Sequence, residues 1–275
     1  MSIDTKKKTN DIDSFANFNI LVILLSMTKK KRLDHYVQHL IEKKQGLNSL
    51  NTAQSLIIQG VVFVNDQKVT KSGFLTTPSD HIDIRYHDTK YVSRGGHKLE
   101  GAFEAFKVSA KDKVCLDIGL STGGFTDYLL QQDAKHIIGI DVAYGIVDLT
   151  IRNHSKTTII ERTNARSATI PTPQYPIEII VMDVSFISVH KILPNIINQV
   201  SPTADFIILI KPQFEGEKKL IPKGGVVTDP DTITHILSQT TQRLSAIGLT
   251  KIDICQSPIK GAKGNQEYFF WLKKV

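Results

Sequence analysis

From residue 113 to the end of the chain, short apolar runs alternate with segments whose apolar residues recur at helical spacing. The apolar runs predict seven strands, near residues 114–118, 136–140, 157–160, 178–183, 205–211, 249–255 and 267–273. The clearest helices between them are expected at residues 124–132, 188–199 and 231–246. Such alternation predicts an α/β fold of the Rossmann-like class, a mostly parallel sheet covered on both faces. A loop rather than a helix joins the last two strands, so an antiparallel strand is expected at one edge.

The residues before this region predict a smaller α+β unit. Apolar residues repeat at helical spacing from Leu33 to Ile41, and a second short helix is expected to end at Gly60. A hairpin about Asn65-Asp66 and a strand at residues 82–86 follow. We therefore expect a tail at residues 1–30, a small domain at 31–88, a linker at 89–97 and a larger domain at 98–275, its first helix starting near Lys98.

The tail predicts neither a membrane span nor a secretory signal. Its apolar run covers residues 18–27, far fewer than the roughly 20 residues that a spanning helix needs. No small-residue cleavage site follows, because the run meets Lys29 and Lys30 directly. We expect a disordered tail without stable membrane insertion, and Met27 is an alternative start of translation. Cys115 and Cys255 lack a C-x-x-C spacing, which favours reduced thiols in a cytoplasmic protein and argues against a disulfide framework or a metal site.

The positive charge is concentrated toward the amino terminus. The whole chain carries a net charge of +7. Residues 31–98 hold ten Lys and Arg against six Asp and Glu, and residues 99–275 hold nineteen against eighteen. A basic excess in one part of a chain indicates either a polyanionic partner bound there or a solvated surface.

The most informative segment is the turn after the first strand of the larger domain, D-I-G-L-S-T-G-G. Gly119, Gly123 and Gly124 have no Cβ, so a ligand can approach the backbone closely. The spacing is not the dinucleotide G-x-G-x-x-G. Asp117 disfavours a phosphate at this turn and favours a cationic ligand, a description that fits S-adenosylmethionine. A nucleotide or nicotinamide site and a purely structural turn remain alternatives.

Charged residues also stand at the ends of the other predicted strands. Asp141 ends the second strand, where an acid can bind ribose hydroxyls or cap a helix. Asp183 ends the fourth strand, Lys211 ends the fifth, and Glu267 begins the last. If the last strand is antiparallel, these three side chains share one edge of the sheet. Lys98, at a helix start, is expected to join them, and such convergence indicates a catalytic site.

Seven segments resemble the TlyA family. They are Y-V-S-R-G-G-H-K-L-E, C-L-D-I-G-L-S-T-G-G-F-T-D, E-R-T-N-A-R, M-D-V-S-F-I-S, L-I-K-P-Q-F-E, K-G-G-V-V and S-P-I-K-G-x-x-G-N-x-E. That family, called haemolysins in older usage, is regarded as ribosomal RNA 2'-O-methyltransferases acting on cytidines. Its catalytic domain is similar to FtsJ, and the resemblance implies a catalytic tetrad of Lys98, Asp183, Lys211 and Glu267. The implied contacts to S-adenosylmethionine are Asp117, Gly119, Ser121, Thr122, Gly123, Gly124, Phe125, Asp141, Asn164, Ala165 and Asp183.

The small domain resembles the S-four RNA-binding domain, with Arg32-Leu33-Asp34 opening its first helix. That domain usually opens its second helix with Ser-Arg-x-Lys-Ala, whereas this chain has S-L-N-T-A at residues 49–53. The resemblance implies ribosomal RNA within ribosomal subunits as the partner. The RNA-binding residues expected are Arg32, Lys43, Lys44, Lys68, Lys71 and Arg94.

The reaction implied by the resemblance is displacement at the sulfonium methyl by a ribose 2'-oxygen, with no metal required. Lys211 is expected to act as the base or to stabilise the developing alkoxide. Two alternatives stay open. A membrane-active haemolysin predicts lysis that depends on residues 1–26. A non-catalytic RNA-binding protein predicts loss of tetrad residues, and all four are present.

Overall fold

The computed structural model describes residues 30–45, 50–84, 90–171, 175–261 and 263–275. They form two compact units, divided between His87 and Asp88. Of the expected tail only Lys30 is described. Residue 89 of the expected linker and residues 85 and 86 of the strand expected at 82–86 lie outside the described part. Within the described residues, no helix is both long enough and apolar enough to cross a membrane.

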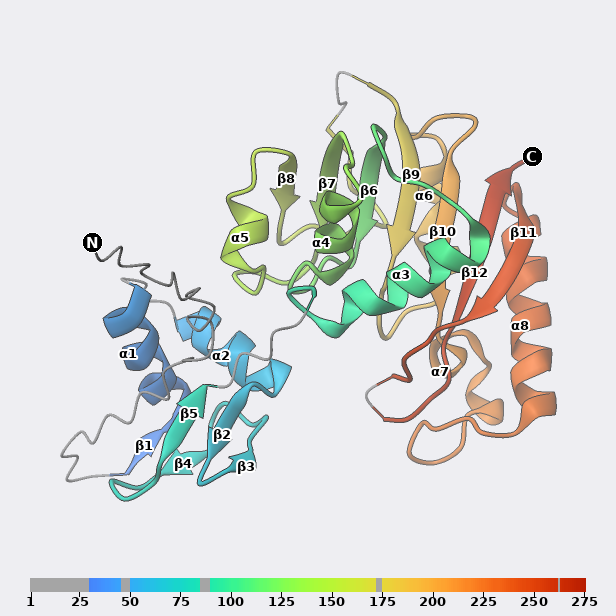
Figure 1. Ribbon diagram of the computed structural model, residues 1–275. Helices are drawn as coiled ribbons and strands as arrows, with labels where there is room; N and C mark the ends of the chain where they lie inside the picture. The colour runs from blue at the N-terminus through green and yellow to red at the C-terminus, as the bar shows by residue number, and fades with distance from the viewer. Residues whose placement is uncertain (1–29, 46–49, 85–89, 172–174, 262) are drawn as a thin grey trace, which may run out of the picture. The chain divides into compact units, whose positions relative to one another are not determined.

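The first unit packs two helices against a small antiparallel sheet (Figure 1). The helices are α1 (Leu33–Gln45) and α2 (Leu50–Gln59). The sheet has the order β3-β2-β5, from β2 (Val62–Val64), β3 (Gln67–Lys68) and β5 (Ile82–Ile84). Asn65 and Asp66 take positive φ angles of 50° and 64°, as a two-residue hairpin turn requires, so the expected hairpin is confirmed. A second ribbon pairs β1 (Lys31–Arg32) with β4 (Leu75–Thr76).

The second unit is built on a seven-stranded sheet of order β11-β12-β10-β9-β6-β7-β8 (Figure 1). The strands are β6 (Val114–Ile118), β7 (His136–Ile140), β8 (Thr157–Ile160), β9 (Ile177–Met182), β10 (Asp205–Ile210), β11 (Leu249–Gln256) and β12 (Tyr268–Lys274). The sheet is parallel except for β12, which runs antiparallel to both β10 and β11. The mostly parallel sheet is therefore confirmed. The antiparallel strand was expected at one edge, but β12 lies one place in from the edge, which β11 forms.

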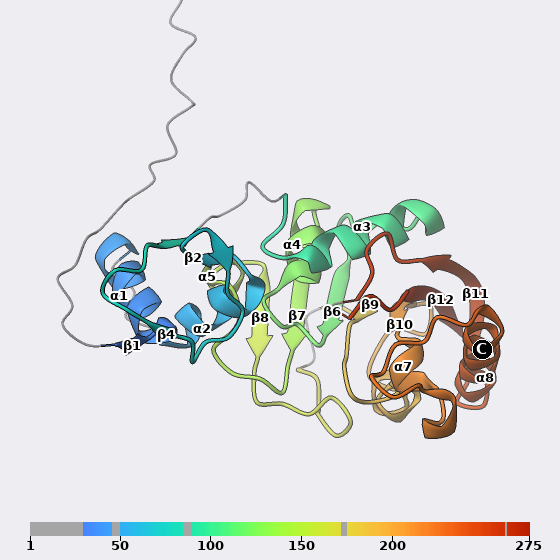
Figure 2. The same cartoon turned by 90° about the horizontal axis from the view of Figure 1, so that it is seen from below.

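Helices cover both faces of this sheet (Figure 2). One face carries α3 (Arg94–Phe106) and α4 (Gly124–Gln131), whose apolar side chains pack on Cys115, Ile179 and Ile207. The opposite face carries α6 (Leu193–Ile197) and α8 (Pro230–Ser245), packed against the alternate residues of the same strands. Shorter helical segments are α5 (Leu149–Arg152), η1 (Val189–Lys191), α7 (Pro212–Glu215) and η2 (Lys218–Leu220). Burial on both faces explains why the central strands read as continuous apolar runs.

Two expectations about helices need correction. The helix expected at residues 188–199 is two pieces, η1 and α6, because Pro194 lacks an N–H and is favoured only in the first turn of a helix. The helix expected from Lys98 begins at Arg94. Tyr91, placed in the expected linker, is only 1% exposed and packs with α3 and α4. Residues 91–97 therefore belong to the folded second unit.

Candidate active site

The carboxyl ends of β6, β9 and β10 lie side by side, and β12 begins at the same edge. Ile118 pairs with Met182 in the parallel register of β6 and β9. Ile210 pairs with Tyr268 in the antiparallel register of β10 and β12. The next residues at this edge are Asp183, Lys211 and Glu267. The register thus brings together three charged side chains from distant parts of the chain.

Together with Lys98 on α3, these side chains form a chain of ion pairs. Lys211 Nζ lies 2.5 Å from Asp183 Oδ1, and Lys98 Nζ lies 2.6 Å from Glu267 Oε2 and 3.9 Å from Asp183 Oδ2. Glu267 is only 2% exposed and Lys211 only 8%. Buried charges are tolerated when they are paired, and each of these has a partner of opposite charge. The expected convergence of the four residues is therefore present in the structure.

Lys211 makes one further contact, with the loop that follows β9. Its Nζ donates to Ser185 Oγ at 3.0 Å in addition to pairing with Asp183. An ammonium has three N–H donors, so one remains for a group outside the described chain. The arrangement can place a positive charge against an oxygen that becomes negative during a reaction.

Asp117 lies on β6 below the glycine-rich turn and is completely buried. Its Oδ2 accepts a hydrogen bond from Thr126 Oγ1 at 2.7 Å, whereas Oδ1 has no partner among the described residues. Burial raises the pKa of Asp117 to about 7, and the nearby charges of Asp183 and Asp141 act in the same direction. A buried carboxyl with one unsatisfied oxygen favours a cationic or hydrogen-donating ligand.

The glycines of the turn serve contacts within the protein. Gly119 has a φ of +83°, and a Cβ at this position would lie 2.4 Å from the carbonyl oxygen of Asp183. Its missing side chain lets β6 and β9 approach where Asp183 must stand. Gly123 and Gly124 are buried at the start of α4. The close approach of Asp183 is thus sufficient by itself to require a glycine at position 119.

Asp141 connects the turn with the loop after β7. Its Oδ2 accepts from the backbone N–H of Ser121 at 2.6 Å, and its Oδ1 accepts from that of Ala143 at 2.8 Å. The backbone carbonyl of Thr122 accepts from the Asp148 N–H, which fixes the other side of the turn. A carboxylate has about four acceptor positions, so Asp141 keeps capacity for hydroxyl donors.

Three other residues expected to contact the cofactor are Phe125, Ala165 and Asn164, and the first two have buried side chains. The ring of Phe125 is 4% exposed and lies 6.0 Å from the ring of Phe269, within the core under α4. Ala165 is 7% exposed and packs in the core on the other face. The side chain of Asn164 is exposed, and its Oδ1 accepts from the Arg166 N–H at 3.0 Å. The side chains of Phe125 and Ala165 therefore act in packing.

An exposed aromatic residue that the sequence did not single out stands beside the tetrad. Phe186 is 90% exposed and has a φ of +65°, an outlier for a bulky residue. Its ring lies 5.1 Å from the ring of Phe214 on α7. Backbone strain of this kind is concentrated at functional sites. The sequence signal was the position of Phe186 within M-D-V-S-F-I-S, three residues after Asp183.

Glu215, on α7, fixes the loop that follows β9 through two hydrogen bonds. It is 3% exposed, and its Oε1 accepts from the Val189 N–H at 2.9 Å while its Oε2 accepts from Ser188 Oγ. Burial raises the pKa of Glu215, opposed by these two hydrogen bonds. Because α7 begins directly after Lys211, the hydrogen bonds of Glu215 fix Lys211 relative to the loop that carries Ser185 and Phe186.

The expected RNA-binding cations are distributed over both units. In the first unit, Arg32 is half-exposed and pairs with Asp34 at 2.6 Å, and Lys43, Lys68 and Lys71 are exposed. The side chain of Lys44 lies outside the described part. In the second unit Arg94 is exposed at the start of α3, and its Nη2 donates to the Lys260 carbonyl at 3.3 Å. Arg94 therefore lies near the loop that leads to Glu267.

Comparison with known proteins gives a consistent result. The sequence pattern of the FtsJ-like methyltransferases matches residues 91–274. Hemolysin A of Brachyspira hyodysenteriae is 40% identical over 239 residues, which cover 86% of this chain and 97% of that protein. The 16S/23S rRNA (cytidine-2'-O)-methyltransferase TlyA of Mycobacterium tuberculosis is 41% identical over 183 residues, covering 66% of this chain and 68% of that protein. A solved structure of a Streptococcus thermophilus protein described as a hemolysin has a TM-score of 0.68 at 30% identity, covering 90% of this chain and 89% of that one.

Proposed function

The chain belongs to the FtsJ-like methyltransferase family, and we propose that it transfers a methyl group to the ribose 2'-oxygen of cytidine in ribosomal RNA. The observation that carries this proposal is the chain of ion pairs through Lys98, Asp183, Lys211 and Glu267, beside the turn at Asp117. Lys211 and Glu267 are buried, and Lys98 and Asp183 are partly buried. A structural ion-pair network would have no need of an open N–H on Lys211 or an exposed Phe186 next to it.

The cofactor is S-adenosylmethionine, and the residues at the edge fit it. Its amino group and sulfonium are cationic, and the turn presents Asp117 with an unsatisfied buried oxygen, along with Asp141 and Asp183. Residues 117–126 contain no Lys or Arg to neutralise a phosphate, which argues against a nucleotide at this turn. Asp117, Asp141 and the turn backbone would hold the cofactor, which supplies a methyl group on positively charged sulfur.

The side chains of the tetrad then act on the ribose hydroxyl. Lys211, held by Asp183 and Ser185, directs its remaining N–H at the 2'-oxygen and stabilises the negative charge that develops there. Glu267 neutralises Lys98, and Lys98 faces the second oxygen of Asp183, so the carboxylate that orients Lys211 is itself fixed. Much of the rate is expected to come from alignment of the reacting atoms in this rigid frame.

Two features support RNA as the substrate. Phe186 and Phe214 offer an exposed aromatic surface beside Lys211, and bases stack on such surfaces when they leave a helix. The first unit has two helices on a small antiparallel sheet and exposed cations at Lys43, Lys68 and Lys71, in keeping with an S-four-type RNA-binding domain. We propose that this unit binds ribosomal RNA within a ribosomal subunit, which places the reaction in the cytoplasm.

The test uses tritiated S-adenosylmethionine and purified small and large ribosomal subunits from a strain that lacks this gene. The expected product is 2'-O-methylcytidine, identified by nuclease digestion and mass spectrometry. Lys211→Ala and the isosteric Lys211→Met are expected to slow transfer by at least about a hundredfold, as loss of one transition-state donor does, while cofactor affinity changes little. Lys219→Ala, an exposed surface lysine, is the matched control.

Normal turnover in both Lys211 variants would remove this residue from the mechanism. Absence of label from both subunits, with cofactor binding intact, would favour the non-catalytic RNA-binding alternative. The haemolysin alternative predicts lysis of erythrocytes that depends on residues 1–26, so the same preparations are compared in a lysis assay with and without that segment.

A further inference from the structure

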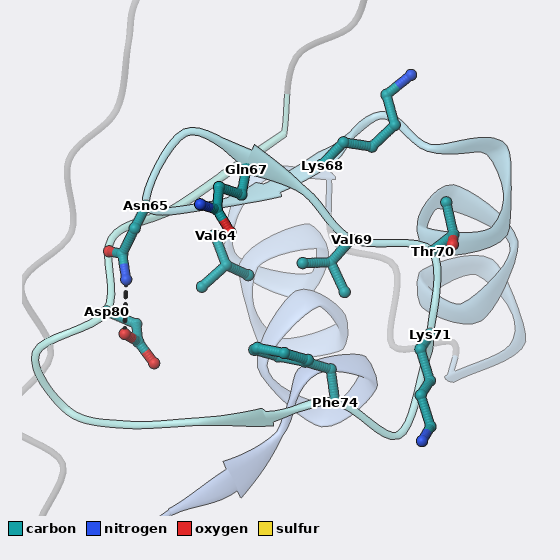
Figure 3. Close-up of a pocket in the computed structure, with 9 residues that line it drawn as sticks. All are labelled: Val64, Asn65, Gln67, Lys68, Val69, Thr70, Lys71, Phe74 and Asp80. Carbon is teal, nitrogen blue, oxygen red and sulfur yellow. Dashed lines mark hydrogen bonds between the residues drawn. The ribbon is translucent and has the colours of Figure 1, made fainter.

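The first unit contains a pocket of about 460 Å³ beside the β2–β3 hairpin. The turn residues of the hairpin and the segment after β3 form its walls (Figure 3). From the residues that line it, we propose that this pocket binds one unstacked nucleobase of a single-stranded RNA segment, in preference a base with an exocyclic amino group. The proposal rests on the proposed function, since it assumes that the enzyme acts on RNA.

The apolar lining of the pocket is unusual for a surface. Val64 and Val69 point toward the ring of Phe74, as Figure 3 shows. Phe74 is 38% exposed and is not part of the core of the first unit, whereas both valines are buried or partly buried. Leaving an aromatic ring half in water forgoes the stabilisation that its burial would give. A flat base stacked on this ring would recover it.

The backbone fixes Phe74 in this position. Its carbonyl accepts from the Leu33 N–H at 2.7 Å, and its N–H donates to the Lys71 carbonyl at 3.0 Å. The ribbon of β1 and β4 continues from Leu75, the next residue. The ring is therefore presented by a braced segment, and binding would need little ordering of the chain.

Polar groups at the opposite side of the pocket can read the edge of a base. Asn65 Nδ2 donates to Asp80 Oδ1 at 2.8 Å, and Asp80 Oδ2 accepts from the Thr77 N–H at 2.6 Å. These hydrogen bonds lower the pKa of Asp80, so its carboxylate is charged at neutral pH. A carboxylate has acceptor capacity beyond these bonds, which suits the exocyclic amino group of adenine, cytosine or guanine. Uracil has no amino group and presents a single N3–H between two carbonyl oxygens that a carboxylate repels, so it should bind more weakly.

Cations stand where the RNA backbone would leave the pocket. Lys68 and Lys71 line the pocket, and their ammonium groups extend outward from its rim (Figure 3). An aromatic surface between two cations is the usual composition of a single-strand site, because stacking holds the base and lysine neutralises phosphate. The pocket's volume lies in the range of small-molecule sites and admits a single base rather than a helix.

The test measures binding of fluorescein-labelled oligo(A), oligo(C) and oligo(U) of about ten nucleotides, and of a matching duplex, to the full-length protein. Phe74→Ala is expected to weaken binding of oligo(A) and oligo(C) about tenfold and to leave duplex binding unchanged. Phe74→Tyr keeps the ring and should restore affinity. Leu75→Ala removes an exposed apolar side chain next to the pocket and is the matched control. Lys71→Ala should weaken all RNAs alike and reduce the salt dependence by about one ion.

A second readout uses the unaltered protein. RNA that carries 5-iodocytidine is irradiated on the complex, and the cross-linked peptide is expected to contain Phe74. Equal RNA affinity of Phe74→Ala and the parent protein would overturn stacking on Phe74. Equal affinity for oligo(U) and oligo(C) would overturn the preference for a base with an amino group. Cross-links only to other segments would overturn the location of the site. Failure of this site alone leaves methyl transfer to ribosomal subunits with an unchanged KM in Phe74→Ala. Failure of the proposed function removes methyl transfer from the parent protein itself.

Discussion

Replacement of Asp117 by Asn tests the electrostatics of the cofactor turn. The carboxyl is fully buried, with one oxygen bonded to Thr126 and the other without a partner in the described structure. Burial raises its pKa from 3.8 to about 7. An amide has nearly the same shape, accepts from Thr126 in the same way and never becomes charged. The substitution therefore removes the ionisation and keeps the packing.

The sign of the effect follows from the two pKa values. In the unfolded chain Asp117 ionises near pH 3.8, and in the folded chain near pH 7. Between these values the folded state retains a proton that the unfolded state has lost, so the free energy of unfolding falls as the pH rises. Each pH unit in this window is worth up to about 1.4 kcal/mol. From pH 5 to pH 7 the parent protein should lose up to ~3 kcal/mol relative to Asp117→Asn.

The single tryptophan of the chain makes this measurement specific. Trp271 lies on β12, and its indole donates to Asp205 at 2.6 Å, so its fluorescence reports unfolding of the second unit. Urea unfolding is followed between pH 5 and pH 8.5 for both proteins and for Asp231→Asn, an exposed control. Parallel stability curves for the parent protein and Asp117→Asn would refute the assignment of a raised pKa to this carboxyl.

Cofactor affinity should depend on the same proton. A cationic ligand prefers the ionised carboxyl, so affinity for S-adenosylmethionine should rise with pH up to about pH 7 and then level off, by at most about tenfold per unit. Asp141 and Asp183 also face the turn and stay in place in Asp117→Asn. Equilibrium dialysis should show a weakened and pH-independent affinity in this variant. The same pH profile in both proteins would mean that Asp117 does not contact the cation.

Two further substitutions test the frame of the site. Gly119→Ala should destabilise the second unit more than Gly248→Ala and abolish methyl transfer: both glycines have positive φ, but only at position 119 would the new Cβ meet the Asp183 carbonyl. If Gly119→Ala and Gly248→Ala lost the same stability in urea unfolding and the same activity in single-turnover assays, this explanation would be wrong. Glu215→Ala leaves the Val189 N–H without its partner and the Ser188 hydroxyl with only the His190 ring, which should cost about 1–3 kcal/mol and lower kcat with little change in cofactor affinity. An unchanged kcat in the folded variant would show that Glu215 does not position the loop.

The sequence predicted the sheet well because its signal is strong. The central strands β9 and β10 contain runs of four and five apolar residues that a charged residue follows directly, and such runs are readily recognised in an alternating pattern. The same reasoning placed Asp183 and Lys211 at one edge, because parallel strands end together. The ribbon of β1 and β4 escaped prediction, since strands of two residues carry no periodicity. The pairing of Ser188 with Glu215 joins positions 27 residues apart and leaves no local pattern.

The sequence motifs predicted which segments lie near the site, but they did not predict which side chains of those segments face it. Phe125 and Ala165 stand within motif segments, yet their side chains face the two cores. Whether a side chain near a strand end faces a core or the ligand edge depends on local backbone direction, which a motif does not encode. Phe186 shows the converse case: only the observed φ of +65° and 90% exposure reveal that this residue is held away from the core.

Lys98 is the member of the tetrad that no strand positions, and its placement depends on residues expected to be a linker. A Cβ on Gly96 would lie 2.2 Å from the ring of Tyr91, so the first turn of α3 packs directly on that buried ring. The Val92 N–H donates to Asp127 on α4 at 2.6 Å, which anchors the same segment from the other side. Lys98 lies one turn further along α3 and reaches Glu267 from there. The segment before the helix is therefore part of the structure that positions Lys98. If Lys98 acts as proposed, a change at Tyr91 should lower turnover through the position of Lys98, although Tyr91 lies outside the ion pairs.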